Sequence, residues 1–225
     1  ASVRWTVRPA IAGTVTGGGN ANDNPRLRLA VEKAKADNMP KDTIEKAIKK
    51  GTGELEGETY EDVLYEGYGP SGVAVMARTM TDNRNRTSGE IRKIFERSGG
   101  SLGSPNCVAF QFTSKGVIIV ARDQAGEDRM MELALDAGAD DVSSSQEIHE
   151  ITSRPEVFHE VKQRIEQAGI AVQSADIAMV AGSSISLDLT AARKEKRLID
   201  ALEAQHDVDA VYSNSDISDD VVAAL

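Results

Sequence analysis

The sequence predicts an α+β protein with three domains, and three observations carry this prediction. Two amphipathic helical segments come first, and an alternation of strands and helices follows them. Residues 51–59 are rich in glycine and glutamate and show no periodicity, which is typical of a hinge. The order strand–helix–strand–strand–helix–strand over residues 116–180 is the ferredoxin-like pattern. The expected domains are a basic helical domain (1–56), an α/β domain (57–113 plus 189–225) and an inserted ferredoxin-like domain (114–188).

The first domain is predicted to contain two helices. Asn24 is a favourable N-cap and Pro25 suits the first helical position, so a helix should begin there. The run Asn38-Met39-Pro40 ends this helix and begins the next, which Gly51 ends. A proline and a glycine within residues 1–16 break any long helix in that segment.

The α/β domain is predicted from a strand followed by a capped helix. Residues 72–80 are apolar and β-branched, as in a buried strand. Thr87 followed by Glu90 is a capping box, so a helix is expected over residues 87–98. Further strands are predicted over residues 62–68 and 108–112.

The inserted unit and the tail complete the expected fold. The strands of the inserted unit are predicted over residues 117–120, 141–145, 147–152 and 170–180, and its helices over residues 127–137 and 155–168. The tail should form a helix (190–205) and a strand (208–213). A lone helix and strand cannot bury their own apolar faces, so we expect the tail to return to the sheet of the α/β domain.

Composition excludes several classes of protein. The chain has 225 residues, of which 40% are apolar, and it has neither an apolar run of membrane-spanning length nor a signal-peptide pattern. Cys107 is the single cysteine, which excludes an intrachain disulfide and a cysteine-rich metal site. A cytoplasmic location is therefore expected.

The charge is distributed unevenly along the chain. Residues 1–53 contain ten Lys/Arg and five Asp/Glu, a net charge of +5, although the whole chain carries −10. Between residues 112 and 190 there are six basic and fourteen acidic residues, a net charge of −8. A polyanion should therefore meet the first domain and avoid the inserted one, whose acidic surface suits a basic protein partner.

Two groups of basic residues are candidates for binding phosphate. Arg84 and Arg86 are expected just before a helix N-terminus, where backbone donors and the helix dipole favour an anion. A wheel count places Lys46, Lys49 and Lys50 opposite the apolar face of the second helix. The alternative for both groups is an ordinary solvated surface with local ion pairs. The full set of predicted nucleic-acid-binding residues is Arg26, Arg28, Lys33, Lys35, Lys41, Lys46, Lys49, Lys50, Arg84, Arg86, Arg92 and Lys93.

Catalysis finds little support in the sequence. Its three histidines are scattered without metal-ligand spacing, and no Gly-x-Ser-x-Gly nucleophile motif is present. We therefore expect no enzymatic activity, no metal site and no cofactor.

Three long motifs resemble the YebC/PmpR family. They are YEGYGPSGVAV with TDNRNRTSGEIRK (65–75 and 81–93), NPRLRLAVEKAKADNMPKDTIEKAIKKGTGELEG (24–57) and LIDALEAQHDVDAVYSNSDI (198–217). The resemblance extends from about residue 17 to the C-terminus and implies the same three-domain layout. The family usually begins with a basic arm rich in histidine and lysine, a pattern that residues 1–16 lack.

The resemblance implies a regulator of gene expression that binds nucleic acid. Members are commonly described as transcriptional regulators, so DNA binding through the basic helices is the leading expectation. The alternative is a translation factor on ribosomal RNA, because the mitochondrial branch activates translation and bacterial members are implicated in relieving ribosome stalling. Composition does not choose between them, since phosphate contacts carry no sequence information. Aromatic residues make up 4% of the chain, too few for base stacking to dominate.

Overall fold

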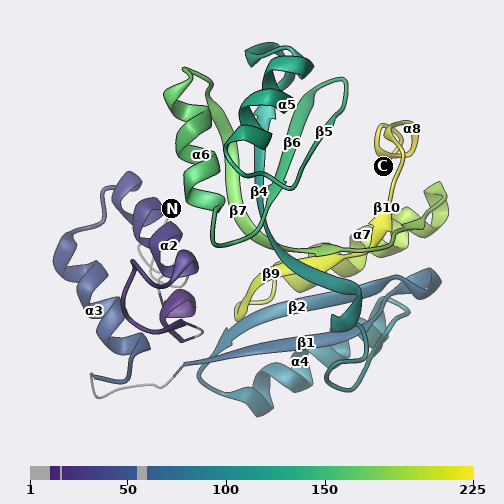
Figure 1. The fold of residues 1–225 in the computed structure, drawn as a ribbon. Coiled ribbons are helices and arrows are strands. Elements are labelled where there is room, and N and C mark those ends of the chain that lie inside the picture. Colours follow the sequence, from purple (N-terminus) through teal and green to yellow (C-terminus); the bar gives the residue numbers. More distant parts are fainter. Residues whose placement is uncertain (1–10, 16, 55–59) are drawn as a thin grey trace. The chain divides into compact units, whose positions relative to one another are not determined.

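The computed structural model describes residues 11–15, 17–54 and 60–225. The chain divides into two compact units, one from the residues up to 113 together with those from 181 onward, and one from residues 114–180 (Figure 1). Both helices and antiparallel sheets are present, which confirms the α+β prediction. Each unit is described by itself below.

Two helices of the first unit have the predicted bounds. They are α2 (Pro25–Ala36) and α3 (Lys41–Gly51). The Asn24 side chain accepts a hydrogen bond from the Leu27 amide at 3.1 Å, and Pro25 takes the first helical position. Asn24 is buried, and its side-chain amide also donates to the carbonyl groups of Gly13 and Gly18. This one residue therefore caps α2 and fastens the preceding segment to it.

The sheet of the first unit includes the end of the chain. Its order is β3-β1-β2-β9, with every neighbouring pair antiparallel. The strands are β1 (Glu61–Tyr68), β2 (Ala74–Thr81), β3 (Ser101–Leu102) and β9 (Val208–Ser213). In the register of β9, Val75 lies opposite Ser213. The prediction that the tail strand returns to this sheet is confirmed.

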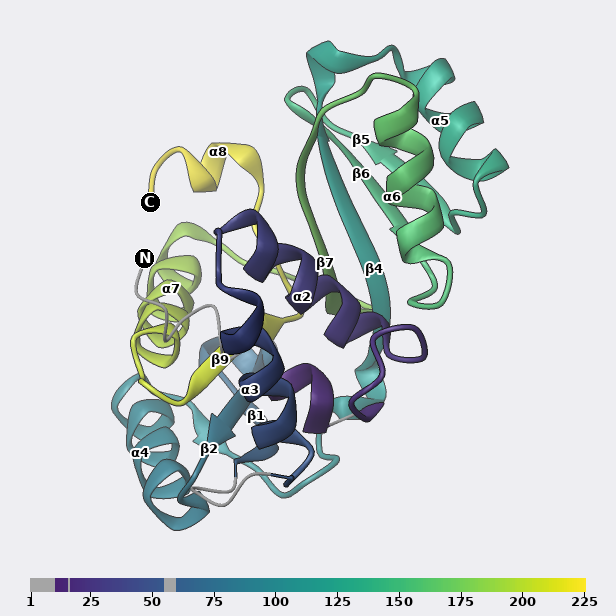
Figure 2. The ribbon, with the colours of Figure 1, turned by 90° about the vertical axis from the view of Figure 1, so that its left-hand side faces the viewer.

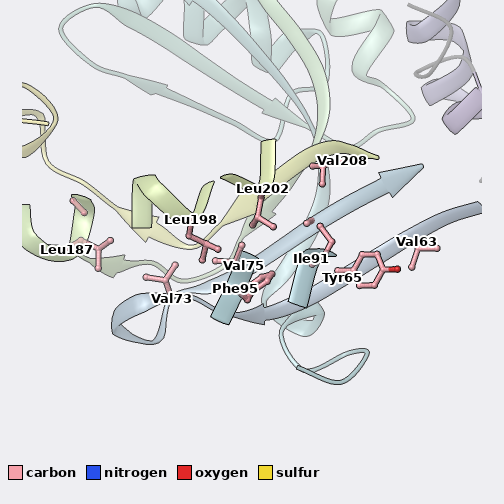
Figure 3. Close-up of a cluster of buried hydrophobic side chains, with 12 residues drawn as sticks. Val63, Tyr65, Val73, Val75, Ile91, Phe95, Leu187, Leu198, Leu202 and Val208 are labelled. Carbon is pink, nitrogen blue, oxygen red and sulfur yellow. The ribbon is translucent and has the colours of Figure 1, made fainter. Parts of the chain in front are cut away.

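Two helices cover one face of this sheet. They are α4 (Arg84–Arg97) and α7 (Leu189–Glu203), and their apolar side chains meet those of the strands (Figure 3). Phe95 of α4 and Leu198 of α7 are fully buried against Val75 of β2. Burying side chains of this size contributes about 1.5–3 kcal/mol each. The apolar stripe of α7 thereby holds the tail in place.

The second unit has the ferredoxin-like order of elements. It contains β4 (Phe112–Ala121), α5 (Glu127–Asp136), β5 (Asp141–Ser144), β6 (Ile148–Ser153), α6 (Phe158–Gln167) and β7 (Val172–Ala181). The strand order is β5-β6-β4-β7, and both helices lie on one face of the sheet (Figure 2). The predicted pattern is confirmed.

Short elements complete the described chain. Residues 11–15 are helical, and β8 (Ile185–Ser186) pairs in parallel with β10 (Ser215–Asp216). The remaining elements are three 3-10 turns, η1 (Pro70–Gly72), η2 (Ala109–Gln111) and η3 (Arg122–Gln124), and a last short helix, α8 (Asp219–Val222).

Two local predictions were wrong. Residues 108–111 are not a strand: Ala109–Gln111 form η2, and β4 begins only at Phe112. The helix predicted from Thr87 begins at Arg84 instead, because the Asn83 side chain accepts from the Arg86 amide at 3.1 Å and takes the cap position. Thr87 lies inside the first turn of α4, where it makes buried side-chain contacts.

Candidate nucleic-acid interface

Arg86 at the start of α4 bonds to carboxylates of the protein itself. Its Nη2 atom donates to Asp82 at 2.9 Å and to both oxygens of Asp207 at 3.1 and 2.9 Å. The Asp207 side chain is 5% exposed, whereas that of Arg86 is 43% exposed. The arginine therefore lies over a buried acid and neutralises it.

Asp207 collects further donors at the start of β9. Thr87 Oγ1 donates to it at 2.6 Å and Gln205 Nε2 at 3.3 Å. Burial opposes ionisation, but the hydrogen bonds from Thr87, Arg86 and Gln205 outweigh it, so the pKa of Asp207 lies below its usual value. The Asp207 carboxylate in turn raises the pKa of Arg86 through a hydrogen bond and its charge. This network joins α4 to β9.

Arg84 and Arg86, which were predicted to bind phosphate together, therefore differ in their surroundings. Arg86 is already held by two carboxylates, so its geometry weighs against a role as a phosphate ligand. The Arg84 side chain is exposed, and its backbone carbonyl accepts a hydrogen bond from the Tyr65 hydroxyl at 3.2 Å. Both residues belong to the first turn of α4 rather than to the loop before it.

Three basic residues of the helical segment also make contacts within the protein. Arg26 forms an ion pair with Asp62 at 3.1 Å. Arg28 donates to the carbonyl groups of Ala21 and Asn22, which closes the turn before α2. The Lys50 ammonium lies 4.7 Å from the centre of the Tyr60 ring, a cation–π distance. Positively charged residues in this region thus serve partly to hold the fold.

The remaining predicted residues carry their side chains on the surface. Lys46 and Lys49 are exposed on α3, whose Ile44 and Ala47 are buried. Lys41 is also exposed and forms an i,i+4 pair with Glu45 at 3.6 Å. The other exposed members of the set are Lys33 and Lys35 on α2, and Arg92 and Lys93 on α4.

The surface of α4 carries a further basic residue, Arg97, that is absent from the predicted set of nucleic-acid-binding residues. A depression of about 280 Å³ lies between α4 and α7, and Lys93 and Arg97 both line it. Glu90 lines it as well and accepts a hydrogen bond from Gln205 of the neighbouring segment at 2.8 Å. Arg97 follows Lys93 by four residues, so helical spacing alone places the two on one face.

Two titratable residues that sequence analysis set aside, His149 and Cys107, lie in environments that do not favour catalysis. The buried His149 bonds to Ser144 at 2.8 Å and to the Ala125 carbonyl at 2.9 Å. Burial and the nearby Glu66 carboxylate raise the pKa of Cys107, which disfavours its reactive thiolate. Among the residues that the structure describes, no group of histidine, cysteine and acidic side chains could hold a metal ion.

Within the described ranges, no helix has both the length and the apolar character needed to cross a membrane.

The fold and its charged surface define a class of α+β protein. In this class a helical segment comes first, a sheet completed by the C-terminal strand follows it, and a ferredoxin-like unit is inserted before that last strand. Two family models match the chain: the TACO1/YebC protein N-terminal domain at residues 9–54 and the TACO1/YebC second and third domain at residues 60–215. The chain belongs to the TACO1/YebC family, as its motifs predicted.

Relatives of known name and structure support this membership. A probable transcriptional regulatory protein of Geobacter sulfurreducens is 50% identical over 209 residues, covering 93% of this chain and 84% of the relative. One from Persephonella marina is 49% identical over 204 residues, covering 90% and 82%. The crystal structure of a conserved hypothetical protein from Aquifex aeolicus matches with a TM-score of 0.82 at 44% identity, covering 96% of this chain and 89% of that one.

Proposed function

We propose that this protein is a non-enzymatic regulator of gene expression that binds nucleic acid through phosphate contacts. The observation that carries the proposal is the exposed pair Lys46 and Lys49 on α3, within a segment of net charge +5. Exposed lysines release counterions when they meet a polyanion. The names of the relatives support a role in transcription, which favours DNA as the target.

The exposed cations on α4 extend the proposed surface. Arg92 and Lys93 lie outward, on the side of the helix away from the buried Ile91 and Phe95. Arg86 is excluded from the proposed surface because Asp82 and Asp207 already hold its guanidinium group. Aromatic residues are scarce, so the proposed mode of binding is recognition of backbone and shape rather than base stacking.

Changing Lys46 and Lys49 together to alanine should weaken binding to a random DNA duplex. If each lysine neutralises one phosphate, the slope of log K against log salt should fall by about two units. The slope is measured by fluorescence anisotropy over a salt titration. A matched control replaces Arg129 and Arg154, two exposed cations of the ferredoxin-like unit, and should leave the slope unchanged. Equal slopes in both double variants and the wild type would show that α3 is merely solvated.

The choice of nucleic acid is tested with the wild-type protein. A transcription regulator should prefer particular promoter duplexes over random duplex by about a thousandfold or more at physiological salt. A ratio near one, together with co-sedimentation with ribosomes, would favour ribosomal RNA as the target instead. Phosphate recognition alone is compatible with that second candidate, since backbone contacts position a protein without reading sequence.

A further inference from the structure

A second cavity lies beside α7 in the first unit, away from the exposed lysines of α3. Its volume is about 310 Å³, within the lower range of small-ligand pockets. The apolar part of its wall comes from α7, β9 and the residues that follow β9: Ile199, Val211, Ile217 and Leu225. Arg193 of α7 donates to the Ala224 carbonyl at 3.0 Å, which holds the wall residue Leu225 near the helix.

A buried carboxylate lines this apolar cavity. Glu195 lies on the core-facing side of α7 and is 1% exposed. Within the described part of the chain, neither of its carboxylate oxygens receives a hydrogen bond of standard geometry. A buried acceptor without a donor is costly, and a buried charge without a counter-charge costs more. The Glu195 carboxylate therefore lacks a well-placed hydrogen-bond donor.

The nearest polar groups leave this deficit in place. The hydroxyl groups of Ser213 and Ser215 line the same cavity and bond to each other at 2.8 Å. Burial raises the pKa of Glu195, and these two hydroxyls offset only part of the shift. They lie close enough to the carboxylate to lower its pKa as weak hydrogen-bond donors, although their geometry falls short of a standard hydrogen bond, and they bring no positive charge.

The other charged groups of the lining neutralise each other. Lys196 Nζ bonds to both oxygens of Asp200 at 2.9 Å. Among the described lining residues, Glu195 is then the charged group without a counter-charge. An anion would be repelled by it, and a purely apolar ligand would leave its oxygens without a donor.

We propose that this cavity binds an ammonium or guanidinium group carried on a short apolar stem. The cation would donate to the Glu195 carboxylate and supply the missing charge, while Ile199, Val211 and Ile217 would surround the stem. The source of the cation is either a free organic amine or a lysine or arginine side chain of a partner. This inference is independent of the proposed function, because the cavity lies on other elements.

The test is a titration of the 15N-labelled full chain with n-hexylammonium, followed by NMR. Amide shifts should concentrate at Ile199, Ser213 and Ser215. Replacing Glu195→Gln removes the charge at nearly constant volume and should weaken binding by tenfold or more, about 1.4 kcal/mol. The matched control Glu203→Gln, an exposed acid of the same helix, should bind like the wild type.

Two further binding measurements test the proposal. Uncharged n-hexanol should bind the wild type about tenfold more weakly or worse, a comparison that needs no variant to fold. Blocked lysine and arginine derivatives mimic the side chain of a protein partner. If they bind, a partner's side chain is a possible source of the cation; if only hexylammonium binds, the source is a free amine. Shifts spread over the surface, or equal binding of hexylammonium and hexanol, would overturn the proposal.

Discussion

Asp207→Ala is expected to lower the free energy of unfolding by about 2–4 kcal/mol. The change removes the acceptor for Thr87 and Arg86, and it leaves the Thr87 hydroxyl in a buried site without its strongest partner. The side chain is 5% exposed, so water replaces little of what is lost. Urea unfolding followed by circular dichroism measures the difference.

A matched acid on the surface provides the control for Asp207. Asp200→Ala removes an exposed i,i+4 partner of Lys196, and such pairs contribute only about 0.3–0.5 kcal/mol. If the two alanine variants were equally stable, the network around Asp207 would contribute no more than an ordinary surface ion pair.

The contribution of the Asp207 network to stability should depend on pH. The folded-state pKa of Asp207 is depressed, so the unfolded chain binds the proton more readily than the folded one. The stabilisation from the ionised carboxylate is therefore complete above the unfolded pKa of about 3.9 and is lost as the pH falls through the lower folded value. The stability difference between wild type and Asp207→Asn should shrink over that acid window.

Local patterns in the sequence predicted much of the fold. Asn24 and Pro25 predict the start of α2, because a helix cap and its helix are neighbours in the chain. The return of β9 followed from an argument about burial, since an amphipathic helix and strand at the end of a chain need an apolar partner. Both predictions rest on residues within a few turns of each other or on a requirement that any fold must meet.

The candidate site was harder to predict because its charges pair over long distances. Arg86 and Asp207 are separated by 121 positions, so no local pattern shows that the arginine is already neutralised. The basic segment around α4 therefore looks more available to phosphate in the sequence than it is in the structure. Exposed lysines such as Lys46 and Lys49 were easier, because the opposite face of an amphipathic helix follows from its spacing.

Glu66 explains the wrongly predicted strand at residues 108–112. Its buried carboxylate accepts hydrogen bonds from the backbone amides of Asn106, Val108 and Ala109 at 2.7, 2.9 and 2.8 Å. These three donors therefore make no ladder hydrogen bonds. Asn106 adopts a φ of 65°, a left-handed conformation that asparagine tolerates better than most residues. An apolar run alone gave no sign of this acid, which precedes it by about 40 positions.

Glu66→Ala is expected to lower the free energy of unfolding by about 2–5 kcal/mol, because three backbone amides lose a charged acceptor at once. Glu66→Gln keeps one side-chain oxygen and should cost less. Glu61→Ala, an exposed acid of the same strand, is the matched control and should change stability by less than about 0.5 kcal/mol.

Hydrogen exchange gives the readout specific to this arrangement. In Glu66→Ala the amides of Asn106, Val108 and Ala109 should exchange faster than in the wild type by more than the global loss of stability explains. Those of β2, whose ladder hydrogen bonds are intact, should follow the global change alone. Uniform acceleration across both sets would mean that Glu66 stabilises the domain as a whole without fixing this loop.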